Sequence, residues 1–396
     1  MQTEIERPEK SETLSIDQFI EKSGVQHVFQ LHEHDEGEIV PFFDSVGMAS
    51  GGFKILMKRQ PRFFDLLKHR GGISYAFGVR DRAGNLSGVG AMTSTVGYIN
   101  RKLENVAYMG DLRVGCPDRE IRREWKTFLG YFMKNSTSLA GVGKRAKIVS
   151  AILETNDRAR AALEEKSFHG QRLKQIASYA MITIWGKKPF TKNDIRYKVE
   201  NGAPLEELED FLDSVHNKQA FGSCFLDPHY ELRRRFQDWA HFSSKDFFVA
   251  RDEAGKIIAT TALWNPNHCK QVVVEGPWWT KFINPIAKFF SLPQFGKPIE
   301  IIYMTHLNFD WSLGDTQRQS AMHSLMDSIW SEKKKRNAHA FAFCDFKGHS
   351  VLPAVKNYIT SSTKVGMYLS VPEEEFATFD PSILGYFPPA FEMALV

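Results

Sequence analysis

The sequence predicts an α/β protein of the α+β type, built from two consecutive units, each a mixed, mostly antiparallel sheet covered by helices. In the first unit, strands over 73–114 are followed by alternating helices and strands that end near residue 186. The same order of elements returns, more weakly, between residues 205 and 346. A chain of 396 residues is also too long for one ordinary core. We therefore expect a flexible N-terminal arm over 1–24, a first domain over 25–187 and a divergent second domain over 188–396.

The composition indicates a globular protein, because 42% hydrophobic and 13% aromatic residues can fill sizeable cores. A formal net charge of +4 permits an anionic ligand but does not indicate a nucleic-acid binder. The four cysteines are scattered without a Cys-x-x-Cys pair, which predicts reduced thiols and neither a zinc site nor disulfides. Residues 1–22 lack the apolar core of a secretory signal, and no apolar run is long enough to span a bilayer. We expect a cytoplasmic protein without integral membrane contact.

The elements of the first unit begin with a short strand over 26–31 and a helix from about residue 38. A second helix is expected over 53–69, interrupted by Pro61 and ended by Gly71 and Gly72. Strands rich in β-branched and aromatic residues are then expected over 73–80, 86–98, 103–114, 146–153 and 173–186.

A basic helix start follows the third of these strands. After Pro117, apolar residues recur at three- and four-residue steps from Ile121 to Met133, which predicts one buried face of a helix. The other side of the first turns carries Arg119, Arg122, Arg123 and Lys126. A helix start already has unpaired N–H groups and a partial positive charge, so arginines there are poor for the helix but suit a phosphate. Otherwise they form a solvated basic face.

Two motifs in this region resemble the GNAT superfamily of acyl-CoA N-acyltransferases. Residues 108–114 read Tyr-Met-Gly-Asp-Leu-Arg-Val and are followed by Pro117 and Arg119, similar to the family's strand-to-helix signature. Downstream, Asn156 with Ala159 and Phe168 is similar to the family's Asn-x-x-Ala…Gly-Phe helix. The resemblance covers residues 25–187 well, and it implies two tandem GNAT-like domains with a divergent second domain.

The resemblance implies that acetyl-CoA or another acyl-CoA is the co-substrate, with no metal. The residues that would hold it are Leu112, Arg113, Val114, Arg119, Arg122, Arg123, Asn156 and Ala159. Arg122 and Glu124 stand where the family's pyrophosphate loop carries glycines, which let backbone N–H groups approach the phosphates. An arginine could replace those contacts with a charge-assisted one, whereas a glutamate repels a phosphate.

The resemblance also implies the catalytic residues. Asp111 lies where the family commonly supplies a base for the acceptor amine, or else it pairs with Arg113 or a neighbour at the sheet edge. Leu163 occupies the position of the family's tyrosine acid, so Tyr108 or Tyr131 would have to substitute, unless both are buried structural tyrosines. Asn156 can hydrogen-bond the amide-rich arm of CoA, cap its own helix, or do both.

The second unit is expected to contain helices over 205–215, 229–240 and 316–335 and strands over 246–251, 256–264, 299–309 and 338–346. Its turn over 312–319 lacks the glycine spacing, and His306 and Asp310 alone are too few to predict a site. An insertion over 275–298 carries aromatic and aliphatic residues at helical steps from Trp279 to Phe290. It is either a lid or wall for an acyl chain or lipid surface, or a helix packed on its own domain, which we favour.

Three functions remain open. The first is an acyl-CoA-dependent N-acyltransferase, with acetyl-CoA as the expected donor and a small-molecule or peptide amine as acceptor. The second is a catalytically degenerate binding or regulatory protein that kept the fold. The third is transfer of a long acyl or aminoacyl group, in which both units act together and the insertion lines the pocket. Fold resemblance supplies the reaction class in each case.

Overall fold

The structure is a computed structural model that describes residues 13–50, 53–115, 117–143, 146–163, 169–191, 196–289, 292–385 and 388–396. The first half of the chain contains α1 (Ile16–Lys22), β1 (Val28–Gln30), α2 (Glu36–Ser45), β2 (Met48–Ser50), β3 (Phe53–Lys58), α3 (Phe63–Arg70), β4 (Ile73–Arg80), β5 (Leu86–Ile99), β6 (Lys102–Val114), α4 (Arg119–Asn135), β7 (Lys147–Leu153), α5 (Asp157–Leu163) and β8 (Gln171–Lys187). The second half contains β9 (Lys198–Asn201), α6 (Leu205–His216), β10 (Gly222–Ser223), α7 (Glu231–Asp238), β11 (Phe247–Arg251), β12 (Ile257–Trp264), β13 (Gln271–Glu275), α8 (Thr280–Phe289), β14 (Ile301–Phe309), α9 (Asp315–Lys335), β15 (Ala340–Phe346) and β16 (Tyr358–Pro372).

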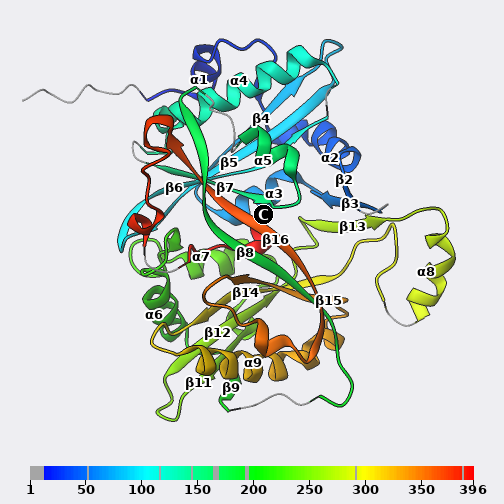
Figure 1. The fold of residues 1–396 in the computed structure, drawn as a ribbon, viewed down its shortest axis with the longest axis vertical. Helices are drawn as coiled ribbons and strands as arrows, with labels where there is room; N and C mark the ends of the chain where they lie inside the picture. Colours follow the sequence, from blue (N-terminus) through cyan, green and yellow to red (C-terminus); the bar gives the residue numbers. More distant parts are fainter. Residues whose placement is uncertain are drawn as a thin grey trace, which may run out of the picture.

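One 13-stranded sheet runs through both halves, in the order β1-β4-β5-β6-β7-β16-β8-β15-β14-β12-β11-β9, with β10 paired to β5. Its pairs are antiparallel except for two, β6 with β7 and β14 with β15. In each parallel pair the connection is a long helix, α4 in the first half and α9 in the second. The predicted fold class, a mixed and mostly antiparallel sheet with covering helices in a repeated order, is confirmed (Figure 1).

The two halves exchange strands at the centre of this sheet. β16, the last strand of the chain, lies between β7 and β8, so it completes the sheet of the first half. β8 in turn pairs with β15 of the second half. The expected domain boundary near residue 187 falls at the end of β8, inside a sheet that continues on both sides.

Helices α4 and α9 cover equivalent faces of the two halves (Figure 1). On α4, Ile121, Trp125, Phe128 and Phe132 are buried against the sheet with residues such as Phe77. On α9, Ala321, Met322, Leu325, Met326 and Ile329 are fully buried in the second half's core. Both helices show the predicted apolar spacing, because one stripe at i, i+3 and i+4 faces the sheet.

One sequence expectation in the first half changes. The helix expected over 53–69 is strand β3 followed by the shorter helix α3, because β3 pairs with β13 from Lys54 to Lys58. Pro61 separates the two, since it removes a donor and restricts the residue before it. Of the expected N-terminal arm, residues 1–12 lie outside the described residues, whereas Ile16–Lys22 form α1 with a capping box from Ser15.

Candidate functional site

The sheet of the first half opens into a split between β6 and β7. The parallel pairing runs only from Val106↔Lys147 to Tyr108↔Val149, although β6 continues to Val114 and β7 to Leu153. Beyond Tyr108, β6 is paired with β5 alone. Its backbone groups on the β7 side therefore border a gap in the ladder, where a ligand can be hydrogen-bonded.

A β-bulge interrupts the regular pairing of β6 with β5 at this split. Val89 pairs with Arg113 and Ala91 with Gly110, so two residues of β6, Asp111 and Leu112, face one residue of β5. Asp111 takes a left-handed conformation with φ of 54°. Bulges and positive φ values at non-glycine residues concentrate at functional sites because they cost conformational energy.

The second half repeats this geometry. β14 and β15 pair only from Ile301↔Ala340 to Tyr303↔Ala342, and the bulge on β14 leaves His306 and Leu307 opposite one residue of β12. His306 has φ of 50° and is the counterpart of Asp111. The sequence placed His306 near this point but carried no signal for the bulge, since neither bulge residue is a glycine.

Asp111 is held by two buried arginines. One carboxylate oxygen accepts from Arg59 Nη2 at 2.5 Å and the other from Arg70 Nη2 at 2.9 Å, and the Asp111 side chain is 2% exposed. Burial alone would raise the pKa of Asp111, but the charges of Arg59, Arg70 and Arg113 hold the pKa well below its ordinary value. Arg113 itself donates to the backbone carbonyls of Phe43, Val46 and Met57. The partners of Asp111 are thus Arg59 and Arg70, and a carboxylate so paired is a weak base.

Tyr108 lies beside this ion pair and borders both the split and an adjoining cavity. The Arg70 guanidinium sits 5.1 Å from the centre of the Tyr108 ring. Burial raises the pKa of Tyr108 to about 12, so the phenol stays protonated at neutral pH. Tyr131, the other tyrosine considered, packs on Phe19 in the core beneath α4, with ring centres 5.0 Å apart.

A cavity of about 480 Å³ adjoins Tyr108 on the sheet face opposite α4. Its wall combines β5 and β6 with α7, the bulge of β14 and the segment that ends the chain. Polar residues that converge on it include Arg70, His216, Glu231, Arg235, His306 and Glu392. A pocket of this size with a few converging polar groups suits a small-molecule substrate.

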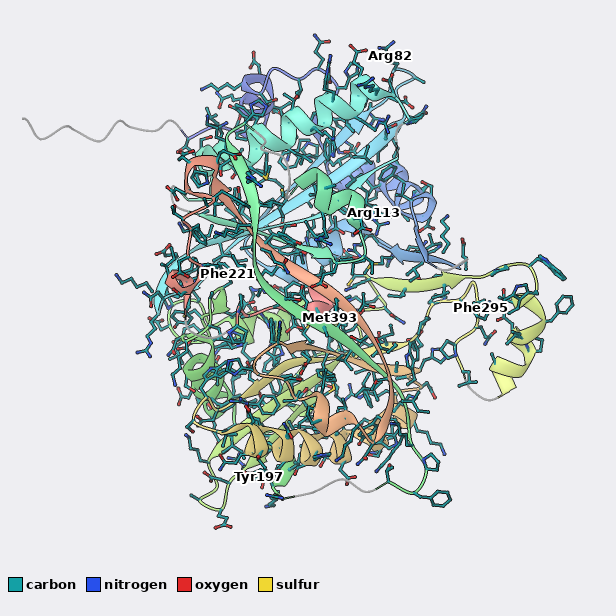
Figure 2. All side chains as sticks on the ribbon, viewed as in Figure 1. Arg82, Arg113, Tyr197, Phe221, Phe295 and Met393 are labelled. Carbon is teal, nitrogen blue, oxygen red and sulfur yellow. The ribbon has the colours of Figure 1, made fainter. Side chains whose placement is uncertain are left out.

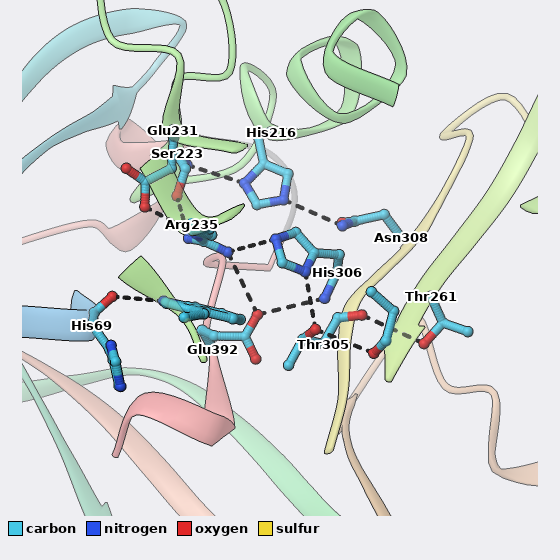
Figure 3. A network of polar contacts seen from close by, with 12 residues as sticks. His69, His216, Ser223, Glu231, Arg235, Thr261, Thr305, His306, Asn308 and Glu392 are labelled. Atoms are coloured by element: carbon cyan, nitrogen blue, oxygen red, sulfur yellow. Dashed lines mark hydrogen bonds and ion pairs between the residues drawn. The ribbon is translucent and has the colours of Figure 1, made fainter. Parts of the chain in front are cut away.

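Arg235 organises the polar wall of the cavity (Figure 3). Its guanidinium donates to Glu231 Oε1 at 2.9 Å and to Ser223 Oγ at 3.2 Å, and it lies 3.8 Å from a Glu392 oxygen. Its Nη1 is 2.8 Å from His306 Nε2. Because an arginine can only donate, His306 Nε2 accepts, and the proton of this imidazole is on Nδ1, which faces Thr305 Oγ1 at 3.0 Å.

Two groups of this network, His306 and Glu392, have shifted pKa values. Burial, and then the charge of Arg235, lower the pKa of His306 well below its ordinary value, so the imidazole is neutral. Burial raises the pKa of Glu392, and Arg235 opposes the shift only in part. Glu392 is therefore a better proton acceptor than an ordinary surface carboxylate. The sequence carried no motif around Glu392, which reaches the site only because the end of the chain folds back over the sheet.

The comparisons with known proteins address the fold. No family model matches the sequence, and no curated protein does. Saccharomyces cerevisiae N-myristoyltransferase with bound myristoyl-CoA aligns over 86% of this chain and 82% of its own, with a TM-score of 0.53 at 11% identity. The GCN5-related glucosamine N-acetyltransferase region of a fungal multi-domain β-N-acetylglucosaminidase aligns over 88% of this chain, with a TM-score of 0.57 at 14% identity. This chain spans only 38% of that second protein.

The chain has the GNAT fold. The split parallel pair, the bulge and the following long helix occur in that order in both halves. The likeness at these identities is one of fold, and the residues of this chain have to carry any functional conclusion.

The helix that follows the split of this GNAT fold is α4, and Asp118 is its N-cap. Asp118 accepts from the Glu120 backbone N–H at 2.8 Å. Arg119 and Arg123 are exposed and Arg122 is half-buried, and no ion pair joins them to the part of the chain that the structure describes.

Glu124, which stands at a glycine position of the pyrophosphate loop, has a partner of its own. Its carboxylate accepts from the His27 backbone N–H at 3.1 Å and lies 2.9 Å from His27 Nδ1. That contact holds the Glu124 carboxylate against the segment before β1, so its charge is engaged there.

Asn156 caps α5. Its Oδ1 accepts from the Ala159 backbone N–H at 3.1 Å, as the capping interpretation expects, and its own side chain is exposed. Ser167 and Phe168 of the same motif lie outside the described residues. The two predicted parts of the CoA site, α4 and α5, follow the two strands that border the split, β6 and β7.

Three side chains of the types that can bind a metal ion cluster at His69, the residue before Arg70. Among the described residues, ligand atoms of His69, His268 and Cys269 lie within 4.8 Å of one another. The two Nε2 atoms are 3.0 Å apart, which an N–H···N hydrogen bond between neutral imidazoles explains. Burial raises the pKa of Cys269 to about 12, and the charges acting on the thiol include Arg59 and Lys270. Cationic neighbours oppose a metal ion, so we assign none to this cluster.

The buried Lys270 side chain is expected to make the free energy of unfolding depend on pH. Burial, and then the charge of Arg59, lower the pKa of Lys270 to about 7, while Nζ donates to the Met393 carbonyl at 2.9 Å. Between pH 7 and 10.5 the unfolded chain binds the proton more tightly, so stability rises with pH by at most about 1.4 kcal/mol per unit. In denaturant titrations, Lys270→Met should remove this rise, and Lys245→Met serves as the surface control. An unchanged slope in Lys270→Met would contradict the assignment.

Within the described residues, no helix is both long enough and apolar enough to cross a membrane.

Proposed function

We propose that the chain is an acyl-CoA-dependent N-acyltransferase, with acetyl-CoA as the first donor to test and a small-molecule or peptide amine as acceptor. The observation that supports this proposal most strongly is the first-half split, which joins a bulged β6, a cavity and the basic start of α4. Neighbours in fold include N-myristoyltransferase with bound myristoyl-CoA. We further propose a cytoplasmic location, in line with the scattered cysteines.

The donor would lie in the split. Arg119, Arg122 and Arg123 would pair with its phosphates at the helix start, where N–H groups add to the positive potential. The backbone of Leu112, Arg113 and Val114 would hydrogen-bond the acyl-pantetheine part, since β6 has no strand partner on that side. Asn156 and Ala159 would contact the same part from α5.

The acceptor amine would enter from the cavity and attack the thioester carbonyl carbon. As the C–N bond forms and the C–S bond breaks, the amine proton would pass to a carboxylate and the sulfur would take a proton from Tyr108. Glu392 is our first candidate for the base because its pKa is raised and it lines the cavity. Asp111, the base implied by the resemblance, is the second, because both its oxygens are paired with arginines.

Release of CoA thiol from acetyl-CoA, followed with a thiol reagent across a panel of amines and peptides, tests the proposal. Tyr108→Phe is expected to lower kcat about 10- to 100-fold with little change in KM, because the leaving sulfur loses its proton donor. Tyr179→Phe is the matched control, since its buried hydroxyl has no partner among the described residues. Thiol release that is absent with every donor and acceptor would favour the degenerate binding protein.

A further inference from the structure

The inference concerns the segment 276–298, which connects β13 to β14 and carries α8. The expectation of a helix packed on its own domain is wrong. α8 stands clear of the body of the molecule at the end of two extended stretches, with Phe295 beside it (Figures 1 and 2). None of its described residues lines the cavity. We call the described residues of this segment, 276–289 and 292–298, the arm.

The arm exposes large apolar side chains, although its threonine is buried. Trp278 is 74% exposed and Phe282 71%, whereas Thr280 is 2% exposed. The other large apolar side chains exposed on the arm are Trp279, Ile283 and Leu292. All five belong to this one projection, and the ring centres of Trp278 and Phe282 are 6.0 Å apart. Several large exposed apolar side chains in one place mark an interaction surface.

Internal hydrogen bonds show that the arm is folded in this orientation. Asn284 Nδ2 donates to the Phe295 carbonyl at 3.0 Å, and the Phe295 backbone N–H donates to Asn284 Oδ1 at 2.8 Å. At the base, the Gly296 N–H donates to the Val274 carbonyl at 2.9 Å. These bonds tie α8 to the returning stretch and tie that stretch to β13, while Trp278 and Phe282 stay exposed.

The charge of the arm identifies the partner. Residues 276–298 contain Lys281, Lys288 and Lys297 and no aspartate or glutamate. Tryptophan and phenylalanine beside lysines, on a short helix too polar to span, are the composition of a segment that lies in a membrane interface. A second copy of this chain would bring the same positive charges together, which disfavours a twofold contact through the arm. We propose that the arm docks the protein on a bilayer surface with anionic head groups, with Trp278 and Phe282 inserted.

This inference is independent of the proposed function, because it needs no acyl-CoA. The experiment is co-sedimentation of the full chain with vesicles of phosphatidylcholine alone and of phosphatidylcholine with a quarter phosphatidylglycerol. We expect binding to the anionic vesicles, at least severalfold weaker binding to neutral ones, and weakening with salt. Trp278→Ser with Phe282→Ser should weaken binding about tenfold or more, because two aromatic side chains no longer leave water.

The matched control is Ile359→Ser with Ile383→Ser, which removes two side chains that are 53% and 58% exposed elsewhere on the surface. This pair should bind vesicles like the wild type. Lys281→Glu with Lys297→Glu tests the charge separately and should abolish the preference for anionic vesicles. Vesicle binding that is absent in the wild type, or retained in the aromatic pair, would overturn the proposal. A dimer in sedimentation that the aromatic pair dissociates would assign the arm to a second copy instead.

Discussion

Asp111→Ala is expected to cost about 3–5 kcal/mol of unfolding free energy, because it leaves two buried arginines without their counter-charge. Arg59 and Arg70 are 4% and 5% exposed, so water cannot replace the carboxylate. Denaturant unfolding of the wild type and the variant measures the difference. Asp44→Ala is the control, because its pair with Lys58 is partly exposed and should contribute about 1 kcal/mol or less.

The pKa of Asp111 in these ion pairs determines the pH below which the stabilisation is lost. Because the folded pKa of Asp111 is depressed, its stabilisation is complete above the ordinary value of 3.8 and is lost as the pH falls below it. The difference between wild type and Asp111→Ala should therefore shrink on acidification below about pH 4. A loss smaller than that of Asp44→Ala at neutral pH would show that Asp111 does not hold the two arginines.

Glu392→Gln is expected to lower kcat about 10²- to 10⁴-fold if Glu392 takes the proton of the acceptor amine. The replacement keeps the shape and the contact with Arg235 but cannot accept a proton. The wild-type kcat should fall on the acid side as Glu392 is protonated, and this limb should disappear in the residual activity of the variant. Steady-state rates of thiol release from acetyl-CoA between pH 5 and 9 measure both effects.

Glu373→Gln is the control, since this carboxylate pairs with Arg172 at the surface. Asp111→Asn separates the two candidate bases. A folded Asp111→Asn without activity, beside a fully active Glu392→Gln, would move the base to Asp111.

Much of the fold follows from local pattern. The apolar spacing of α4 and α9, and the strands from Ile73 to Val114, can be recognised from the periodicity of each segment's own sequence. The exchange of β8 and β16 at the centre of the sheet depends on pairing between residues that are far apart, and no local signal specifies it. For the same reason the sequence predicts a helix where β3 lies, because its partner β13 is far away in the chain.

The residues of the candidate site likewise fall into a local group and a group from distant parts of the chain. Tyr108, Asp111 and the arginines of α4 lie in one stretch of sequence, so a local resemblance predicts them, whereas Glu392 and Arg70 reach the candidate site from distant segments. The apolar spacing of the arm also predicts a helix, and α8 is one. Periodicity shows which residues share a face of a helix, but not what covers that face. The arrangement of the two bulges could have been sought by comparing the two halves strand by strand.

The most direct measurement of the central claim is calorimetric titration with acetyl-CoA of the wild type and of Arg119→Ala with Arg123→Ala. Arg101→Ala with Lys102→Ala serves as the control, because both are exposed and basic but lie outside α4. The account predicts saturable binding, with a Kd raised about tenfold or more by loss of two charge-assisted phosphate contacts and unchanged in the control. Binding that survives intact in the α4 pair would place the phosphates elsewhere, and no binding of acetyl-CoA or a long-chain acyl-CoA would contradict an acyl-CoA site in this fold.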